Sequence, residues 1–195
     1  MTGMAKKRLA RRKKTAAEIR LPGDPPTEAL LARMIRVDHA GEFGARRIYA
    51  GQLAALKDSP SCPAIRRMAQ QEDRHLAAFE KLIVEKGIRP TIFHPVWHVA
   101  GYVLGFATAA LGEKAAMACT VAVEETIVEH YQAQIARLGT KDPALKKMIA
   151  RFCAEEDEHR HTGREHGAEG LPYYPLLRAF IRGGSKTAIW LSERF

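Results

Sequence analysis

The chain has 195 residues, 46% of them hydrophobic, which is enough for one domain with a single buried core. Its formal net charge is +9, but residues 1–14 hold seven of the lysines and arginines and none of the acids. The remainder has no basic stripe and no nucleic-acid-binding motif, so nucleic acid is not an expected partner. The three cysteines form no C-x-x-C pair, which excludes a disulfide scaffold or a thiolate zinc site and is typical of a reducing compartment.

Residues 1–26 are predicted to form a flexible basic arm and linker, and residues 27–195 to form the folded domain. The linker is the stretch Pro22-Gly-Asp-Pro-Pro26. The arm fits a disordered tail, a contact with a membrane surface or a targeting segment. A secretory signal is not expected, because no apolar core follows the basic start.

The first predicted helix begins at Thr27, which is expected to cap it. Apolar residues recur along one face at steps of three and four, and Asp38 and Glu42 fall within this face. A buried carboxylate is unfavourable without a cation or dense hydrogen bonding, so these two residues need one or the other. Three glycines that weaken this helix indicate close approach of another helix or a ligand, or tight packing alone: Gly41, Gly44 and Gly51.

A second helix is predicted from Pro63 to Lys86, where Gly87 ends it. Its inner face carries Glu72 and His75 among apolar residues at the helical period. This is the first Glu-x-x-His of the chain, and it lies where a surface helix would place only apolar side chains.

Residues 91–112 contain no charged side chain and are long enough to span a bilayer as a helix. Proline, glycines and two histidines make them a poor span. The segment is therefore expected to enter the membrane interface in part, or to form the wall of a site for an apolar substrate, with an ordinary core helix as the alternative. Gly101 and Gly105 permit close helix packing, and His94 and His98 are expected at a membrane or loop edge.

Two further amphipathic helices follow. The first carries Glu124 on its apolar face, and the second begins at Asp142-Pro143, an N-cap followed by a proline, and carries Glu156 and His159. A last helix is expected to break at Gly183-Gly184. Because no segment alternates with period two for long, the whole chain is predicted to be helical.

The second half of the chain repeats the first. Each half has a glutamate on an apolar helix face, Glu42 or Glu124, followed by a Glu-x-x-His on a later helix. Two carboxylate helices and two Glu-x-x-His helices are the arrangement with which four-helix bundles hold two metal ions. The predicted fold is therefore an all-α, ferritin-like four-helix bundle with additional apolar or interfacial helical segments.

The six repeated side chains are candidate metal ligands. Residues i and i+3 share a helix face, so each Glu-x-x-His can bring both side chains to one ion. Oxygen-rich ligand sets with few nitrogens and no thiolate favour iron or manganese over zinc or copper. Mutually satisfied Glu–His pairs in a metal-free bundle are the alternative. The candidates are Glu42, Glu72, His75, Glu124, Glu156 and His159.

Other polar residues are candidates to orient these ligands. His130 and Tyr131 lie beside and on the face that carries Glu124, and they are the candidate catalytic residues. Asp38 and His39 are further candidates, although His39 also fits a salt-linked helix surface. Two acids off the ligand face are expected to be solvated: Glu155 and Glu158.

Four stretches spread over the folded domain resemble one known family. They are Arg36-Val-Asp-His-Ala-Gly-Glu42, Ala116-Met-Ala-Cys-Thr-Val-Ala-Val-Glu-Glu125, Glu155-Glu-Asp-Glu-His159 and Leu191-Ser-Glu-Arg194. With these motifs in order, residues 27–195 resemble the demethoxyubiquinone hydroxylase family of ubiquinone biosynthesis, a ferritin-like di-iron group. The metal ligands of that family fall on the six candidates above, so the resemblance implies two iron ions per chain.

The resemblance implies an O2-dependent monooxygenase that hydroxylates the ring of demethoxyubiquinone or its quinol to give demethylubiquinol. It also implies a polyprenyl benzoquinone or quinol substrate, electrons from NADH or from the quinol, and a protein partner that presents the lipid. No G-x-G-x-x-G occurs, so a Rossmann-type nucleotide site is not expected.

The same resemblance implies peripheral attachment to the cytoplasmic face of the cell membrane, or to the matrix side of the mitochondrial inner membrane in a eukaryote. Two other functions fit the motifs. One is a different ferritin-like di-iron oxidase or ferroxidase, and the other is a non-enzymatic iron- or lipid-binding scaffold at a membrane.

Overall fold

The computed structural model describes residues 26–195, and these contain helices but no strand, which confirms the predicted all-α fold. The predicted basic arm, residues 1–26, lies outside this range except for its last residue. The helices are α1 (Thr27–Leu56), α2 (Cys62–Lys86), α3 (His94–Ala110), α4 (Glu113–Leu138), α5 (Pro143–Glu165) and α6 (Tyr174–Arg194), with a short 3-10 helix, η2 (Ala168–Gly170), before α6.

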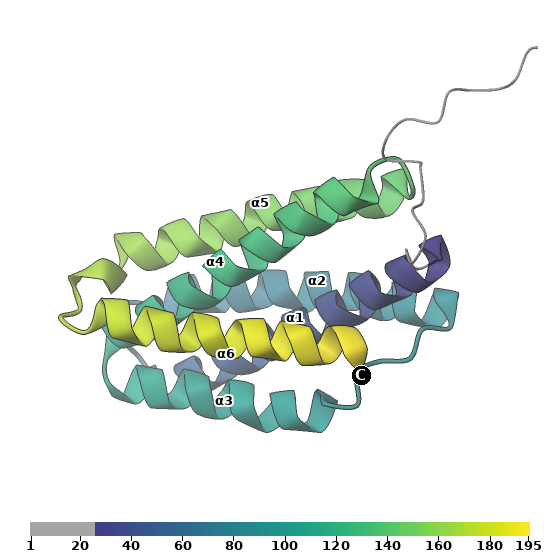
Figure 1. The fold of residues 1–195 in the computed structure, drawn as a ribbon. Helices are drawn as coiled ribbons and strands as arrows, with labels where there is room; N and C mark the ends of the chain where they lie inside the picture. The colour runs from purple at the N-terminus through teal and green to yellow at the C-terminus, as the bar shows by residue number, and fades with distance from the viewer. Residues whose placement is uncertain (1–25) are drawn as a thin grey trace, which may run out of the picture.

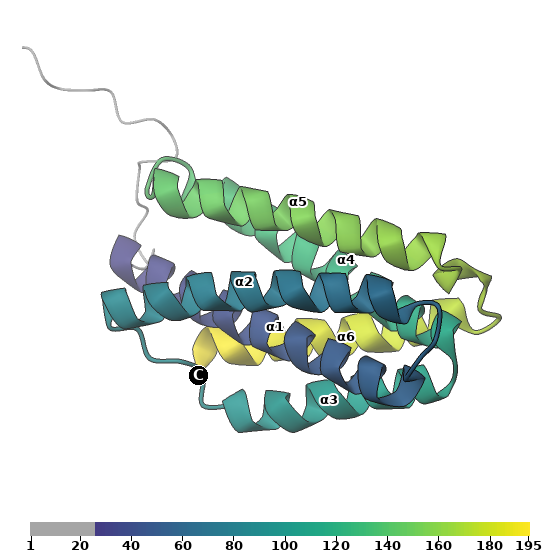
Figure 2. The ribbon, with the colours of Figure 1, turned by 180° about the vertical axis from the view of Figure 1, so that it is seen from behind.

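The four amphipathic helices of the repeat, α1, α2, α4 and α5, form a ferritin-like bundle (Figures 1 and 2). α1 packs against α2, and α4 packs against α5, as the repeated halves require. α3 packs against α1 outside the four-helix bundle, and α6 packs against α4 and α1. The two added helices are the apolar segments that the sequence predicted beyond the four-helix bundle.

Local signals account for most helix ends. α5 begins at Pro143 behind Asp142, whose Oδ1 accepts a hydrogen bond of 2.9 Å from the Leu145 amide. α2 ends at Gly87, which adopts a φ of 60° that favours glycine. The expected cap at Thr27 was wrong, because the N-cap position is occupied by Pro26. The Pro26 carbonyl accepts a hydrogen bond of 3.0 Å from the Leu30 amide, and Thr27 is the first residue of the helix itself.

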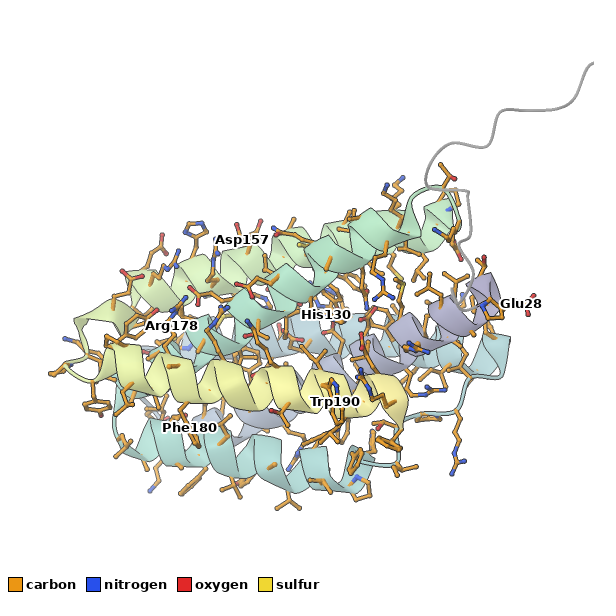
Figure 3. All side chains as sticks on the ribbon, viewed as in Figure 1. Glu28, His130, Asp157, Arg178, Phe180 and Trp190 are labelled. Atoms are coloured by element: carbon orange, nitrogen blue, oxygen red, sulfur yellow. The ribbon has the colours of Figure 1, made fainter. Side chains whose placement is uncertain are left out.

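The expected break at Gly183-Gly184 was also wrong, because α6 continues through both residues. Ion pairs hold the helix before the glycines: Arg178 and Arg182 both contact the buried carboxylate of Glu125 on α4, at 2.6 and 3.1 Å. Beyond the glycines, Ser192 accepts a hydrogen bond of 3.0 Å from Trp97 of α3. Figure 3 shows Arg178 on the side of α6 that faces α4. Tertiary contacts on both sides therefore outweigh the low helix propensity of glycine.

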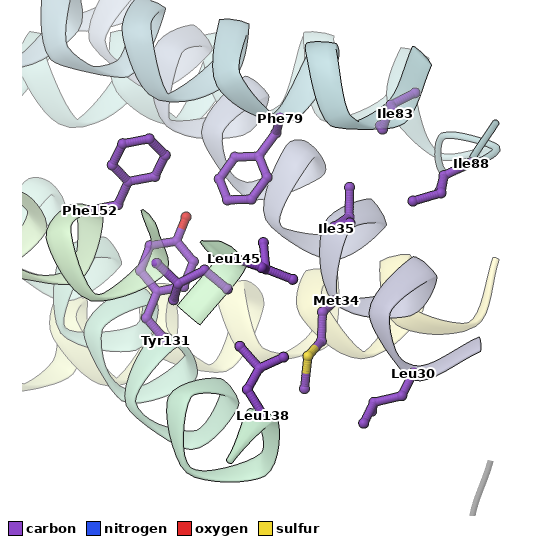
Figure 4. Packing of buried hydrophobic residues seen from close by; sticks show 11 residues of the cluster. Leu30, Met34, Ile35, Phe79, Ile83, Ile88, Tyr131, Leu138, Leu145 and Phe152 are labelled. Carbon is purple, nitrogen blue, oxygen red and sulfur yellow. The ribbon is translucent and has the colours of Figure 1, made fainter. Parts of the chain in front are cut away.

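The hydrophobic core is divided into clusters along the bundle. The largest cluster fills the end that contains the start of α1 and the end of α4, where Phe79, Tyr131 and Phe152 pack with aliphatic residues from all four bundle helices (Figure 4). A second cluster, which includes Tyr49 and Met68, lies toward the other end. Buried polar residues from the middle of each helix lie between the two clusters.

Glycines allow α1 and α3 to approach closely. A Cβ on Gly105 of α3 would overlap the backbone of Ile48, and a Cβ on Gly51 of α1 would overlap the backbone of Tyr102. The predicted close packing at these glycines is therefore present. Gly41 and Gly44 differ, since a Cβ at either position meets nothing within 4 Å. There is thus free space beside both residues, although the Gly44 carbonyl oxygen lies only 2.9 Å from the position of a Cβ on Gly101 of α3.

α3 and α6 expose large apolar side chains. No helix in the described range is long and apolar enough to cross a bilayer. Val99 and Val103 of α3 are 60% and 56% exposed, and Leu176 and Phe180 of α6 are 75% and 76% exposed. Figure 3 shows Phe180 and Trp190 projecting from α6. The two added helices thus present an apolar surface outside the bundle.

His39 is buried in the interface between α1 and α3. Its ring stacks on that of His94, with centroids 5.7 Å apart, and Phe43 packs against His94 at 3.7 Å. His39 is therefore buried rather than part of a salt-linked surface, and His94, expected at an edge, is only partly exposed. Burial, and then the charge of His94, lower the pKa of His39 to about 4.

We expect this histidine to make the fold sensitive to acid. The folded-state pKa of His39 lies below the ordinary value of 6.5, so the unfolded chain binds the proton more readily. Its contribution to stability is complete above pH 6.5 and is lost as the pH falls toward 4. The free energy of unfolding, measured by urea denaturation across this range, should fall less in His39→Gln than in the wild type. The exposed His161 provides the control, because His161→Gln should keep the wild-type slope; equal slopes for all three proteins would refute the assignment.

Candidate metal centre

Four bundle helices direct the six candidate ligands to one point in the core. Each side chain is at most 2% exposed. Ligand atoms lie within 4.8 Å of one another in two groups, which share Glu72 and Glu156. The first group adds Glu42 and His75, and the second adds Glu124 and His159. The structure thus brings together all six side chains that the repeat singled out, in an arrangement that could hold two metal ions.

The Glu-x-x-His spacing turns both imidazoles toward the shared carboxylates. His75 Nδ1 lies 2.9 Å from Glu156 Oε1 and 3.4 Å from Glu42 Oε2. His159 Nδ1 lies 3.0 Å from Glu156 Oε2 and 3.2 Å from Glu72 Oε1. Glu156 therefore places one oxygen in each group, as a bridging carboxylate would.

The cluster fits a bound cation because its inward atoms lack hydrogen bonds. Eight atoms of the six candidate ligands are buried without a hydrogen-bond partner: Oε2 of Glu42 and Glu124, both carboxylate oxygens of Glu72 and Glu156, and Nδ1 of His75 and His159. Buried polar atoms are rarely left in this state, and each is costly. Two divalent ions would satisfy these atoms and balance the charge of four carboxylates.

The crowded charges shift one another's pKa values. Burial and then the charge of Glu156 raise the pKa values of Glu72 and Glu124 well above their ordinary range. Burial acts in the same direction on Glu156, but the imidazoles of His159 and His75, 3.0 and 2.9 Å from its oxygens, outweigh it and lower its pKa to about 2. Burial opposes the charged form of His75, yet Glu156 and Glu42 raise its pKa to about 10. Protons thus take the place of cations in the cluster, and a metal ion must displace them.

Each unshared glutamate accepts a hydrogen bond from a tyrosine on the other glutamate helix. Tyr131 of α4 donates to Glu42 Oε1 of α1, and Tyr49 of α1 donates to Glu124 Oε1 of α4 at 2.7 Å. Tyr131 was a candidate orienting residue, whereas Tyr49 was not. The signal for it was available, because each tyrosine follows the glutamate of its own helix by seven residues.

His130, the other candidate catalytic residue, lies beside Asp38 rather than beside a ligand. Its Nε2 is 3.4 Å from Asp38 Oδ1 and accepts a hydrogen bond of 2.8 Å from Gln134. Gln134 also donates to Asp38 Oδ1 at 2.7 Å. Burial raises the pKa of Asp38 to about 6, against the opposing effect of His130 and Gln134. These residues form a polar group on the Glu42 side of the centre.

The expectation that Glu155 is solvated was wrong. Its Oε2 lies 2.6 Å from Nε2 of His75, and its side chain is only 25% exposed. The equivalent contact on the other histidine comes from Gln71, whose Oε1 is 3.0 Å from Nε2 of His159. Gln71 and Glu155 each immediately precede a shared glutamate, so they lie beside the helix face that carries the ligands. Gln71 of α2 reaches His159 of α5, and Glu155 of α5 reaches His75 of α2. Glu158 is exposed, as predicted.

An apolar cavity of about 100 Å³ lies among α1, α3, α4 and α6. The cavity lies against the two helices that carry the unshared glutamates. Its lining includes glycine and alanine residues on either side of Glu42 on α1, and Val123, which precedes Glu124, on α4. Residues 91–112 were predicted to form the wall of an apolar site, and one of them, Trp97, lines this cavity. The lining comprises Val37, Ala40, Gly41, Gly44, Ala45, Ile48, Trp97, Val123, Ile127, Ser185, Ala188, Ile189 and Ser192.

Comparisons with known proteins agree with this architecture. The chain is 53% identical over 179 residues to a 3-demethoxyubiquinol 3-hydroxylase from Rhodospirillum rubrum, covering 91% of this chain and 84% of the relative. It is 46% identical over 189 residues to a human protein named NADPH-dependent 3-demethoxyubiquinone 3-hydroxylase, mitochondrial, covering 93% and 87%. A yeast 5-demethoxyubiquinone hydroxylase, mitochondrial, is 36% identical over 183 residues, covering 85% and 78%. Residues 29–192 match the family described as ubiquinone biosynthesis protein COQ7, and the chain belongs to that family.

Proposed function

We propose that this protein is an O2-dependent hydroxylase of ubiquinone biosynthesis that acts on the ring of demethoxyubiquinone or its quinol. The observation that carries the proposal is the pair of buried Glu/His groups, in a bundle whose two glutamate helices also line an apolar cavity and in a chain whose relatives bear the name of this activity. The six clustered residues are the proposed ligands of two iron ions. Bound iron would supply the activation of O2, and the chain supplies binding, orientation and a site shielded from water.

The side chains around the proposed ligands have distinct tasks. Tyr49 and Tyr131 hold the unshared glutamates in place through their hydroxyl groups. Glu155 and Gln71 accept hydrogen bonds from the outer nitrogens of the histidines, which directs both Nδ1 atoms inward. The apolar cavity beside the glutamate helices is the proposed place of the quinone ring.

The substrate and the electron donor follow from the relatives and the surface. Several relatives, including those from mouse and Dictyostelium discoideum, are named NADPH-dependent, which supports a reduced nicotinamide rather than the quinol as the source of electrons. The exposed apolar side chains of α3 and α6 support a peripheral membrane position from which a polyprenyl substrate enters. The eukaryotic relatives named here are mitochondrial, which supports that location for a eukaryotic source.

The direct test is turnover with isotopically labelled O2. Purified, iron-loaded protein is given a short-tailed demethoxyubiquinone and reduced nicotinamide, and the product is analysed by mass spectrometry. One labelled oxygen atom on the ring is expected. An unaltered quinone, together with continued oxidation of added ferrous iron, would instead favour a ferroxidase. Glu124→Gln, which removes one proposed ligand without changing the side-chain size, is the matched inactive control.

We expect Gly44 to control the size of the ring site. A Cβ at this position meets nothing within 4 Å, so Gly44→Ala should fold and gain about 1 kcal/mol of helix stability. Gly44→Ile fills part of the cavity and should lower kcat/KM for the quinone about tenfold or more while metal content stays the same, since one misplaced side chain can cost that much in orientation.

The control for Gly44 is another helical glycine with free space around it. A Cβ on Gly183 of α6 also meets nothing within 4 Å, and this glycine does not line the cavity. Gly183→Ile should leave quinone kinetics unchanged. Normal kinetics in Gly44→Ile would place the ring elsewhere.

A further inference from the structure

The candidate centre has an approximate twofold symmetry that reaches beyond the six candidate ligands. Tyr49 and Tyr131 occupy equivalent places, each bonded to the glutamate of the opposite half. Gln52 and Gln134 follow Glu42 and Glu124 by ten residues each, and they too reach across the centre. Gln134 donates to Asp38 at 2.7 Å, and Gln52 donates to Thr120 at 3.3 Å. The two halves therefore support one another reciprocally.

At two pairs of equivalent positions, one half has an acidic residue and the other half has a neutral one. The residue before the shared glutamate is Gln71 in one half and Glu155 in the other. The residue four places before the unshared glutamate is Asp38 in one half and Thr120 in the other. Because the contacts cross the centre, both acidic members lie on the same side, the side of Glu42 and His75.

The contact to the ligand histidine is the stronger of the two differences. Glu155 Oε2 lies 2.6 Å from the outer nitrogen of His75, whereas the neutral amide oxygen of Gln71 lies 3.0 Å from that of His159. A carboxylate in this position makes an imidazole a more basic ligand than an amide does. Arg151, 3.8 Å from the other oxygen of Glu155, is 66% exposed and therefore screened by solvent.

The second difference adds negative charge in the same place. Asp38 is 2% exposed and lies in the polar group beside Glu42, where it accepts a hydrogen bond of 2.7 Å from Gln134. Thr120, its counterpart beside Glu124, is neutral. A divalent ion carries twice the charge of a proton that it displaces, so the extra negative charge favours the metal ion over the proton.

We propose that the two metal positions are unequal: the position formed by Glu42 and His75 binds a divalent ion more tightly and fills first, and Glu155 is the positioning residue that sets the difference. This inference rests on the two-metal site of the proposed function. It assigns an order to the two positions. The six ligands alone do not determine that order, because each position has one unshared glutamate and one histidine and both share Glu72 and Glu156.

The test is a titration of metal-free protein with Zn²⁺, followed by calorimetry and by NMR of ¹⁵N-labelled histidine. Two binding steps are expected for the wild type, and the first equivalent should shift the His75 Nδ1 resonance before that of His159. Glu155→Gln should weaken the first step by about 10- to 100-fold, the usual effect of removing an outer partner of a ligand. Gln71→Glu should strengthen the second step.

The double exchange Glu155→Gln with Gln71→Glu is the decisive variant, because it keeps the total charge and nearly the same side-chain volumes. In this protein the His159 resonance should shift first. Repulsion between two equivalent ions could separate the steps in the wild type, but it could not reverse their order. Equal steps, or an order unchanged by the exchange, would overturn the inference and leave the two-metal site standing. Failure of the wild type to bind Zn²⁺ would overturn both.

Discussion

Glu156→Ala is expected to lose both metal ions and the hydroxylase activity together. Glu156 is fully buried, belongs to both groups of candidate ligands and places one oxygen within 2.9 Å of His75 Nδ1 and the other within 3.0 Å of His159 Nδ1. Its two oxygens lie in different groups, so its removal takes one proposed donor from each metal position. The loss of activity should exceed the roughly 10- to 100-fold effect that follows from changing an outer partner of a ligand.

The measurement is the iron content per chain by elemental analysis, alongside turnover and circular dichroism. Glu158→Ala is the matched control, because Glu158 lies two residues further along α5 but is exposed. It should retain wild-type iron and activity. A folded Glu156→Ala protein that still holds two iron ions would show that the six side chains are not the ligand set.

Gly105→Ala is expected to be strongly destabilising although it adds a single methyl group. The new Cβ would overlap the backbone of Ile48 on α1, and backbone atoms cannot move aside as the end of a flexible side chain can. Overpacking of this kind costs about 1–3 kcal/mol, and the upper part of that range applies here because both partners are helix backbones. The free energy of unfolding, measured with urea, should fall accordingly.

Gly184→Ala makes the same chemical change inside another helix, where a Cβ meets nothing within 4 Å. It should be neutral or should gain up to about 1 kcal/mol from helix propensity. If Gly105→Ala were as stable as this control, α3 would not pack on α1 as described. The same geometry means that a bulky residue at Gly101 or Gly105 tests helix packing, and substitutions at Gly44 are the better probe of the cavity.

Periodicity and spacing were sufficient to predict the helices, their bundle and the repeated Glu-x-x-His pattern. The reason is that a helix face is a local property: Glu72 and His75 share a face because they are three residues apart, whatever surrounds them. The repeat of this pattern in both halves made a joint site the simplest outcome. The choice of Glu124 over Glu125, and of Glu156 over Glu155 or Glu158, also rested on the family resemblance. Helix ends marked by Asp142 and Gly87 were predictable for the same local reason.

Glycines indicated that some helices pack closely, but the partners in each contact could not be predicted in this way, because they depend on how far apart the helices lie and how they are rotated. α6 continues through Gly183 and Gly184 because Arg178 and Arg182 reach Glu125 on a distant part of the chain. Gly105 faces α1 rather than a substrate because the two backbones approach closely at that point.

The sequence by itself determined the repeated pattern of glutamates and histidines, because residues three apart on a helix share a face. Only the tertiary structure decided which side chains support them. Glu155 and Gln71 stand just off the ligand faces, and they reach His75 and His159 because α2 and α5 lie within a side chain's length of each other. The charge difference between the two halves follows from that separation, a distance between helices that no local pattern encodes.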